Sequence, residues 1–293
     1  MFGISFKKRE RQYPFIVMTI LVKNEVDIIE ANIRTHAHLG VDAFVVMDNN
    51  STDGTRELLA SLQKEFDLIV IDETSFYQQK KFMTKLAFIA KKRYQPDWII
   101  NNDADEFWIP EKKQSLKDVL RIKGAVLRVN RYNMLPTKNS LTDKMDFFNS
   151  KYEVSNQIYY RVGERDSLSV LFGQASRKVI VNPKGLIKIN SGNHSAEHLF
   201  FWDKKTMTNI KNYHYPIRSY QQFEKRVLTR KAVLDNFPQV KMGNHYRMLV
   251  AQYEAGKLEE EYQKFILTEE ELGVLKRLAI ISYNQTPIQT IIR

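Results

Sequence analysis

Apolar runs of strand length alternate with amphipathic helical segments over the first hundred residues of the chain. The apolar runs cover residues 15–22, 43–47, 68–71 and 98–100. Segments 25–38, 55–65 and 79–94 lie between them and carry apolar residues at helical spacing. Because a chain that alternates strands and helices builds a parallel sheet with helices on both faces, this pattern predicts an α/β fold.

The last of these runs ends in three acidic side chains within four residues, Asp103, Asp105 and Glu106. On an extended backbone Asp103 and Asp105 point to the same side, and two like charges at a strand end repel unless a cation neutralises them. Clustered carboxylates suit a hard divalent ion, Mg²⁺ or Mn²⁺, which also holds phosphate oxygens. The alternative is a solvated acidic turn, but the position directly after a strand favours a binding site.

Polar residues also follow the first two strands. The loop 48–55 opens a helix, so free backbone N–H groups face the strand ends. Asp48 is suited to accept a hydrogen bond from a nucleobase or a ribose hydroxyl, whereas Asp53 is equally well explained as a helix cap. Asn24 and Glu25 follow the first strand, where Glu25 has the alternative role of a first-turn helix acid. The convergence of three strand ends on one sheet edge predicts a pocket.

Composition narrows the class of protein. Lys and Arg number 45 against 34 Asp and Glu, and the formal charge of +11 favours anionic partners such as nucleotide phosphates, nucleic acid or an acidic membrane. The absence of cysteine excludes disulfides, thiolate metal sites and a cysteine nucleophile, and it fits a reducing compartment. No signal peptide is expected, and no apolar run approaches the roughly 18 residues of a membrane span.

The C-terminal quarter has a helical pattern. Ser219 with Gln222, and Thr268 with Glu271, have the spacing of capping boxes. We therefore expect a sheet domain over residues 13–217 and a helical extension over residues 218–293. Residues 203–231 contain eight Lys or Arg against two acidic residues, which predicts a local role in binding an anion or a membrane.

Several motifs stand in a recognisable order: the segment 19–25, the loop 48–55, and Asp103-Ala-Asp-Glu-Phe107. Residues 177–183 and His214-Tyr-Pro-Ile-Arg-Ser219 follow them. Together they resemble a bacterial branch of the family 2-type glycosyltransferases. The resemblance covers about residues 15–231. It implies a GT-A fold, which is a Rossmann-like, mostly parallel central sheet with helices on both faces, here followed by the C-terminal helical extension.

The resemblance implies an enzyme that transfers a sugar from a nucleotide-diphosphate sugar to a saccharide or lipid-linked acceptor, in bacterial surface polysaccharide or lipopolysaccharide synthesis. Asp103 and Asp105 would serve the ribose and a Mn²⁺– or Mg²⁺–diphosphate complex. The metal would offset charge on the departing nucleoside diphosphate. The remaining nucleotide-sugar contacts would come from Asn24, Glu25, Asp48, Asp53, Arg218, Lys225 and Arg226; for the last three, a solvated helix face is the alternative.

Histidine is the next candidate ligand. The resemblance implies a late histidine on the metal, for which His214 is the first choice and His194 the second; a core or surface role is the alternative for both. His36 and His38 lie near the predicted C-terminus of a helix and are expected to have a surface or helix-dipole role.

An inverting transfer needs a carboxylate that deprotonates the acceptor hydroxyl. The resemblance places such a base several tens of residues after the acidic motif. Glu197 is the best-placed candidate, with Asp166 and Asp146 as rivals.

Two other functions are compatible with parts of the pattern. A nucleotidylyltransferase would carry a glycine-rich phosphate loop after the first strand, where this chain has Leu21-Val-Lys-Asn-Glu25. A non-enzymatic nucleic-acid-binding protein would explain the charge but leaves the strand-end carboxylates unexplained, so no nucleic acid partner is expected. We expect a cytoplasmic protein that contacts the anionic inner face of the cell membrane through its basic segment.

Overall fold

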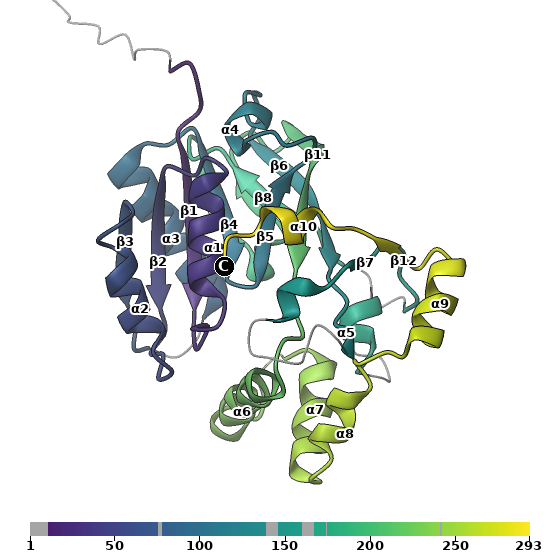
Figure 1. Ribbon diagram of the computed structural model, residues 1–293. Coiled ribbons are helices and arrows are strands. Elements are labelled where there is room, and N and C mark those ends of the chain that lie inside the picture. Colours follow the sequence, from purple (N-terminus) through teal and green to yellow (C-terminus); the bar gives the residue numbers. More distant parts are fainter. Residues whose placement is uncertain (1–10, 76–77, 139–145, 160–166, 174, 241) are drawn as a thin grey trace, which may run out of the picture.

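The computed structural model describes residues 11–75, 78–138, 146–159, 167–173, 175–240 and 242–293 (Figure 1). Its strands are β1 (Ile16–Val22), β2 (Ala43–Asp48), β3 (Leu68–Asp72), β4 (Trp98–Asp103), β5 (Glu106–Pro110), β6 (Val126–Asn133), β7 (Tyr152–Val154), β8 (Lys178–Val181), β9 (Leu186–Ile189), β10 (Ala196–His198), β11 (Lys204–His214) and β12 (Ile281–Tyr283).

The helices are α1 (Ile29–His38), α2 (Thr55–Leu62), α3 (Gln79–Tyr94), α4 (Leu116–Val119), α5 (Ser169–Phe172), α6 (Tyr220–Asn236), α7 (Asn244–Glu254), α8 (Leu258–Gln263), α9 (Glu269–Arg277) and α10 (Thr286–Thr290). Two 3₁₀ turns, η2 (Asp146–Asn149) and η3 (Ser191–Asn193), complete the described elements. All of the strand and helix segments predicted in the first hundred residues are present, with α1 and α2 shorter than expected at one end.

Eight strands form one sheet in the order β3-β2-β1-β4-β8-β6-β11-β5. The pairs β3–β2, β2–β1, β1–β4 and β6–β11 are parallel. The strand β8 runs antiparallel to β4 and β6, and β5 runs antiparallel to β11. The predicted fold class, a mostly parallel α/β sheet with helices on both faces, is therefore confirmed.

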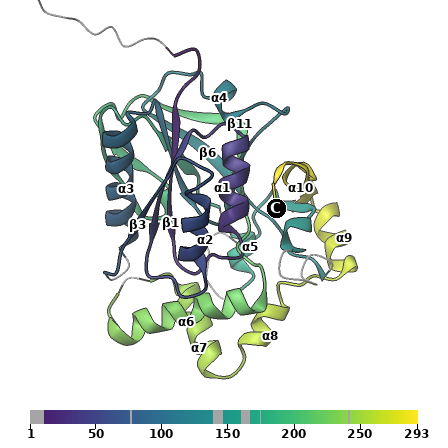
Figure 2. The ribbon, with the colours of Figure 1, turned by 60° about the vertical axis from the view of Figure 1, so that its left-hand side comes forward.

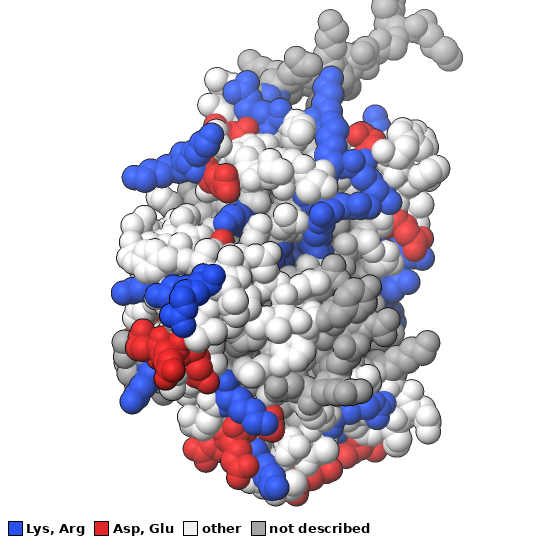
Figure 3. All heavy atoms as spheres, turned by 90° about the vertical axis from the view of Figure 1, so that its right-hand side faces the viewer, with Lys and Arg blue, Asp and Glu red and all other residues white. Residues whose placement is uncertain are grey.

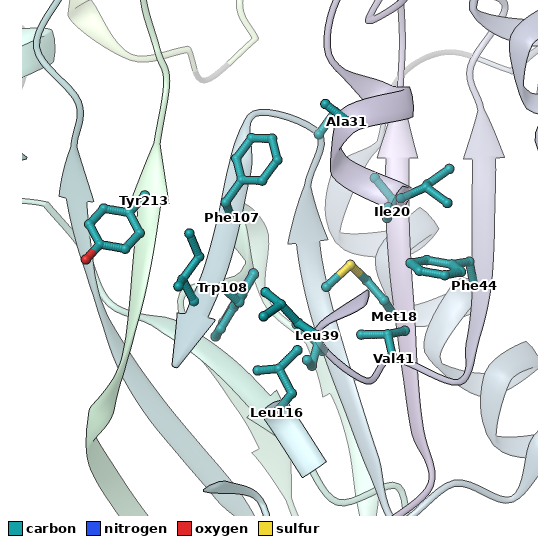
Figure 4. Packing of buried hydrophobic residues seen from close by; sticks show 14 of the residues in the cluster. Met18, Ile20, Ala31, Leu39, Val41, Phe44, Phe107, Trp108, Leu116 and Tyr213 are labelled. Atoms are coloured by element: carbon teal, nitrogen blue, oxygen red, sulfur yellow. The ribbon is translucent and has the colours of Figure 1, made fainter. Parts of the chain in front are cut away.

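The two faces of the sheet bury different side chains because successive strand residues point to opposite sides. Met18 and Ile20 of β1 pack with Phe44 and Trp108 in the core below α1 and α2 (Figure 4). Val17 and Leu21 of β1 point to the other face and pack under α3 with Phe82, Met83, Leu86 and other residues. Because both faces of β1 are covered, its sequence is a nearly continuous apolar run.

The register of the parallel strands brings the polar strand ends together. Val22 at the end of β1 lies opposite Asp48 of β2, and Leu21 lies opposite Asp103 of β4. The loops that follow β1, β2 and β4 therefore share one edge of the sheet, as the sequence predicted.

The helices α6, α7 and α8 lie at this same end of the molecule (Figure 1 and Figure 2). Figure 2 shows α6 running beneath the sheet, with α7 and α8 packed against it. The hydrophobic cluster there crosses the predicted boundary at residue 217, since Leu135, Leu171 and Phe172 pack with Phe223 and Leu249. The chain then pairs β12 with β7, and Ile292 N donates to Thr35 Oγ1 of α1 at 2.9 Å. The helical extension is thus tied to the sheet at several points.

One prediction about the first helix was wrong. His36 is fully buried, and its Nε2 accepts a hydrogen bond from Trp108 N at 3.0 Å. Burial lowers the pKa of His36 to about 3, although Asn32 O opposes this effect, so the ring is neutral. The prediction of a surface role was wrong because β5 packs against α1. The backbone N–H of Trp108 in β5 needs a buried acceptor there, and His36 supplies it.

Candidate active site

The acidic motif forms a reverse turn rather than an extended segment. The strand β4 ends at Asp103, Ala104 and Asp105 form the turn, and β5 begins at Glu106. The alternation of side chains along a strand does not continue through such a reversal, so Asp103 and Asp105 have different neighbours. The expectation that both lie on the same side of one extended segment is corrected here.

Lys178 neutralises the first part of the motif. Its Nζ contacts Asp103 Oδ2 and lies 2.9 Å from Glu106 Oε1. Lys178 and Glu106 are both fully buried, and Asn212 Nδ2 donates to Glu106 Oε2 at 2.8 Å. Burial by itself would lower the pKa of Lys178, but the two carboxylates outweigh burial and raise it. At Asp103, Lys178 therefore supplies the positive charge that we expected from a metal ion.

Asp105 lies between a guanidinium and an imidazole. Arg226 Nη2 of α6 donates to Asp105 Oδ2 at 3.0 Å, and His214 Nε2 lies 3.5 Å from the same oxygen. Burial opposes the ionisation of Asp105, but His214, Arg226 and Arg218 hold its pKa well below the usual range. Asp105 is therefore a buried carboxylate that stays ionised.

The orientation of His214 is set by Asn133. Asn133 Nδ2 donates to Leu171 O at 2.7 Å, which turns Asn133 Oδ1 toward His214 Nδ1 at 2.7 Å. Burial lowers the pKa of His214, and the Asp105 carboxylate offsets only part of that effect. The Nδ1–H of the ring donates to Asn133 Oδ1, so Nε2 is the nitrogen that faces the Asp105 carboxylate, and a shared proton or a cation can lie between them.

This arrangement suits a shared cation. Two acceptors 3.5 Å apart repel unless a proton or a metal lies between them, and a hydrogen bond to the other ring nitrogen is typical of metal-binding histidines. Two adjacent ligands of an octahedral ion lie about 3 Å apart. Asp105 and His214 therefore fit as two metal ligands, whereas Asp103 is occupied by Lys178 and by Asn193 Nδ2 at 3.0 Å. Within the described ranges no group of three His, Cys, Asp or Glu residues is arranged to hold a metal.

Arg218 joins the C-terminal segment to the loop after β1. It is fully buried, with Nη2 2.6 Å from Glu25 Oε2 and Nε 2.9 Å from Asp27 Oδ2. Tyr262 Oη donates to Arg218 O at 2.8 Å. Burial raises the pKa of Glu25 to about 7, against the opposing effects of Arg218 and Arg226. Arg218 and Glu25 lie at the predicted edge, as a structural ion pair within reach of the Asp105 group.

The loops after β1 and β2 brace one another. Asn24 has a positive φ of 59°, and its Oδ1 accepts from Thr52 N at 2.8 Å. Asp48 accepts from Ser51 N at 3.1 Å and also contacts Ser51 Oγ. Asp53 Oδ1 accepts from Thr55 N at 3.0 Å just before α2, whose N-cap position is occupied by Gly54 without a side-chain cap. Their roles in nucleotide binding remain predictions.

A cavity of about 260 Å³ lies beside this group. Arg131 and Asn133 of β6 line it and also contact Glu106 and His214, respectively. Arg177 lies on its wall and donates to Asn130 Oδ1 at 3.0 Å. The other lining residues are Tyr132, Val154, Ser155, Asn156, Gln157, Leu171, Gly173 and Ala175. The cavity is mainly polar and adjoins the Asp105–His214 pair.

Other candidates lie apart from the Asp105 group. Glu197 is half-exposed on the β9–β10 hairpin and pairs with Lys188 at 2.6 Å. Lys225 is exposed on α6 beside Arg226, and successive helical residues point about 100° apart. His194 Nδ1 lies 3.1 Å from Arg177 O, and burial lowers the pKa of His194 to about 4. Of the two other base candidates, Asp146 begins η2, whereas Asp166 lies outside the described residues.

The basic segment does not form one surface. Arg218 is buried, Lys211 Nζ pairs with Glu153 at 2.8 Å, and Lys231 pairs with Asp235 at 2.9 Å. Figure 3 shows one face of the molecule on which both signs of charge are present. No helix in the described part of the chain has the length and apolar character needed to cross a bilayer.

Sequence reasoning passed over Lys178, Arg131 and Asn133 as site residues. In the sequence Lys178 stands within the motif 177–183, and the pairing of β8 beside β4 is what places it against Asp103. A lysine at the start of an otherwise apolar run is the one signal that was available. The roles of Arg131 and Asn133 depend on contacts with β5 and β11 that a single sequence does not encode locally.

Comparison with known proteins identifies the class of protein. The family model described as glycosyltransferase family 92 matches residues 17–264, so the chain belongs to that family. The glycosyltransferase class that the sequence suggested is confirmed, and family 92 is the family shown, in place of the family 2-type branch. The match also extends beyond residue 231 through α6, α7 and α8.

Distant likenesses occur among solved structures, whereas no curated protein matches the chain. TarS of S. aureus is 13% identical, with 83% of this chain and 43% of that chain covered and a TM-score of 0.42. TarS 1–349 in complex with UDP-GlcNAc is 12% identical, covering 80% and 70%, with a TM-score of 0.43. Glucosyl-3-phosphoglycerate synthase of Mycobacterium tuberculosis, in complex with Mn²⁺, UDP and phosphoglyceric acid, is 15% identical, covering 41% and 43%, with a TM-score of 0.28. The chain thus spans less than half the length of the full TarS structure.

Proposed function

We propose that this protein is a metal-dependent glycosyltransferase that uses a nucleotide-diphosphate sugar and binds the donor at the carboxyl ends of β1, β2 and β4. Family membership supports sugar transfer over the nucleotidylyltransferase and nucleic-acid-binding alternatives. One observation supports the metal most directly: Nε2 of His214 lies 3.5 Å from the ionised Asp105 carboxylate, so the two side chains can share a cation.

In this proposal Asp105 and His214 would hold Mn²⁺ or Mg²⁺ beside the diphosphate of the donor. The bound ion would stabilise negative charge on the departing nucleoside diphosphate. Arg226 already lies on Asp105, so it is placed to neutralise the diphosphate as well. Asp103 is proposed as a contact to the ribose rather than to the ion, because Lys178 and Asn193 occupy its oxygens.

We assign the acceptor to the polar cavity lined by Arg131, Asn133 and Arg177. Arg131 Nε is buried and has no hydrogen-bond partner among the described residues, which suits a group that arrives with the acceptor. The acceptor class is a saccharide or a lipid-linked saccharide, in keeping with the proposed role in surface polysaccharide synthesis.

An inverting outcome is part of the proposal and requires a carboxylate base. Glu197 remains the sequence candidate for this base. Glu197 lies on an exposed hairpin, where it pairs with Lys188. A loss of turnover in Glu197→Gln would therefore report on catalysis rather than on folding. If Glu197 is the base, this variant keeps donor affinity and loses turnover; unchanged turnover removes Glu197 from the mechanism.

Donor binding is testable by thermal shift with a panel of nucleotide sugars, with and without Mn²⁺. A donor at 100 times its Kd stabilises the folded state by about 2.7 kcal/mol. That corresponds to a rise in Tm of roughly 4 °C for a chain of this length. UDP-sugars are the first probes, because the TarS and synthase structures contain UDP or UDP-GlcNAc.

The matched variants are Asp105→Asn at the site and Asp235→Asn on the exposed side of α6. We expect Asp105→Asn to lose the Mn²⁺-dependent shift while Asp235→Asn keeps it. A shift that does not change on adding Mn²⁺ or excess chelator contradicts the metal, and no shift with any nucleotide sugar contradicts the donor class.

A further inference from the structure

The chain exposes four consecutive large apolar side chains at one reverse turn. Leu199, Phe200, Phe201 and Trp202 are 62%, 42%, 65% and 68% exposed. The turn joins β10 to β11. Contiguous exposed apolar surface is uncommon on soluble proteins and marks a place of interaction.

Backbone hydrogen bonds hold this turn in place. Leu199 N donates to Gly185 O at 2.8 Å, Asp203 N donates to Phe200 O at 3.1 Å, and Ala125 N donates to Asp203 O at 3.0 Å. The rings pack on one another rather than on the core, with the Phe201 and Trp202 centroids 5.0 Å apart. Since the backbone is fixed from both sides, the apolar tip is a built feature of the fold.

Gly185 makes room for this arrangement. Its φ is +98°, and a Cβ there would lie 2.9 Å from the His198 ring and 3.1 Å from the Phe200 ring. The His198 ring is itself fixed, because Nε2 lies 3.0 Å from Asn182 O and Phe200 N donates to Nδ1 at 3.1 Å.

Basic residues adjoin the tip. Lys204 and Lys205 begin β11 one residue after the tip, and the Lys205 ammonium donates to Lys123 O. Lys184 precedes Gly185 in the β8–β9 connection and is exposed. The acidic neighbours are Asp203, which follows the turn, and Glu197, whose charge is paired with Lys188.

We infer that the turn 199–202 is a membrane-binding tip that inserts Phe201 and Trp202 into the interfacial region of an anionic phospholipid bilayer. Trp and other aromatic side chains prefer this region, and Lys side chains beside them bind anionic headgroups. Exposed aromatic rings beside lysine side chains match the apolar and anionic layers of such a surface. This tip differs from the residue 203–231 segment first considered. Of the basic residues of that segment, Lys204 and Lys205 are the ones that adjoin the tip.

The tip lies far from the proposed metal and donor site, so membrane binding and donor binding are testable separately. The strand β11 runs from Lys204 beside the tip to His214 at the site. At about 3.3 Å per residue its length is roughly 30 Å. Changes at residues 201 and 202 are therefore expected to leave nucleotide-sugar binding intact.

Trp202 is a built-in reporter for the experiment. The chain has three tryptophans, and Trp98 and Trp108 are buried at 2% and 0% exposure. We expect vesicles of phosphatidylcholine with phosphatidylglycerol to blue-shift the fluorescence of the full-length protein, and bromine-labelled lipid to quench it. Pure phosphatidylcholine vesicles and high salt are expected to weaken both effects.

Co-sedimentation with the same vesicles completes the test. We expect Phe201→Ser/Trp202→Ser to weaken binding roughly tenfold or more, and Lys204→Glu/Lys205→Glu to weaken it similarly. The matched controls are Leu278→Ser, which is 64% exposed elsewhere, and Lys257→Glu on the exposed start of α8. Retained binding by the tip variants overturns the inference, as does absence of vesicle binding by the wild type. A dimer in light scattering that Phe201→Ser/Trp202→Ser converts to monomer, without vesicle binding, assigns the tip to self-association instead.

Discussion

Replacing Arg218 by Met is expected to destabilise the protein strongly, because it leaves two carboxylates without their cation. Arg218 is fully buried and lies 2.6 Å from Glu25 and 2.9 Å from Asp27. Removing one member of a buried ion pair costs about 3–5 kcal/mol. The carboxylate side chains retain 17% and 21% exposure, so the lower end of this range, about 3 kcal/mol, is appropriate.

This loss translates into a measurable shift in Tm. For 293 residues the unfolding entropy is about 0.6 kcal/mol/K, so 3 kcal/mol lowers Tm by about 5 °C. The experiment is thermal and urea unfolding at pH 8, where Glu25 is ionised, with the exposed Arg277→Met as the matched control. The control is expected to change stability by less than about 0.5 kcal/mol.

A double-mutant cycle with Glu25→Gln isolates the pairing. If the unpaired carboxylate is the cause, adding Glu25→Gln to Arg218→Met restores part of the lost stability. The cost of Arg218→Met is also expected to shrink toward pH 6, because Glu25 then takes up a proton. A loss below about 1 kcal/mol at pH 8, or a cycle with no coupling energy, refutes this reasoning.

Glu25, Asn133 and Lys178 each give one further prediction. Because burial raises the pKa of Glu25 to about 7, the folded state binds this proton more tightly than the unfolded state; wild-type stability should fall as pH rises from about 4.5 to 7, and urea titrations should show a flatter profile for Glu25→Gln. Asn133→Ala should weaken Mn²⁺ binding about 10–100-fold in an electron paramagnetic resonance titration, since Asn133 sets the tautomer of His214, and unchanged affinity would contradict that role. Lys178→Met should cost about 3–5 kcal/mol in urea unfolding by leaving Glu106 buried without its closest cation, and a near-neutral effect would show that Arg131 suffices.

The strands and helices near the N-terminus were predictable because their signals are local. The apolar run of β1 and the periodicity of α3 each lie within one short window, and α3 begins and ends at the predicted residues. The shared edge of Asp48 and Asp103 was also predictable, since parallel strands end on the same side.

The partners of the acidic motif were not predictable in the same way. Lys178 is 75 residues from Asp103, and its position depends on β8 inserting antiparallel beside β4. The turn at Ala104 removed the basis for placing Asp103 and Asp105 side by side. His36 was misread because helical periodicity gives a face, whereas its burial depends on β5 crossing that face. Long-range pairing, which a single sequence does not reveal, decides the positions of Lys178 and His36.

Sugar release from a nucleotide-sugar donor tests the proposed metal site most directly. The measurement is the rate of nucleoside diphosphate release from the donor identified by thermal shift, with Mn²⁺ or with excess chelator, for wild type, His214→Ala and Asp105→Asn. We predict turnover that requires Mn²⁺ and falls at least about 100-fold in both variants while both stay folded at the assay temperature. Full turnover by the wild type in excess chelator, or by either variant, would contradict a metal held between Asp105 and His214.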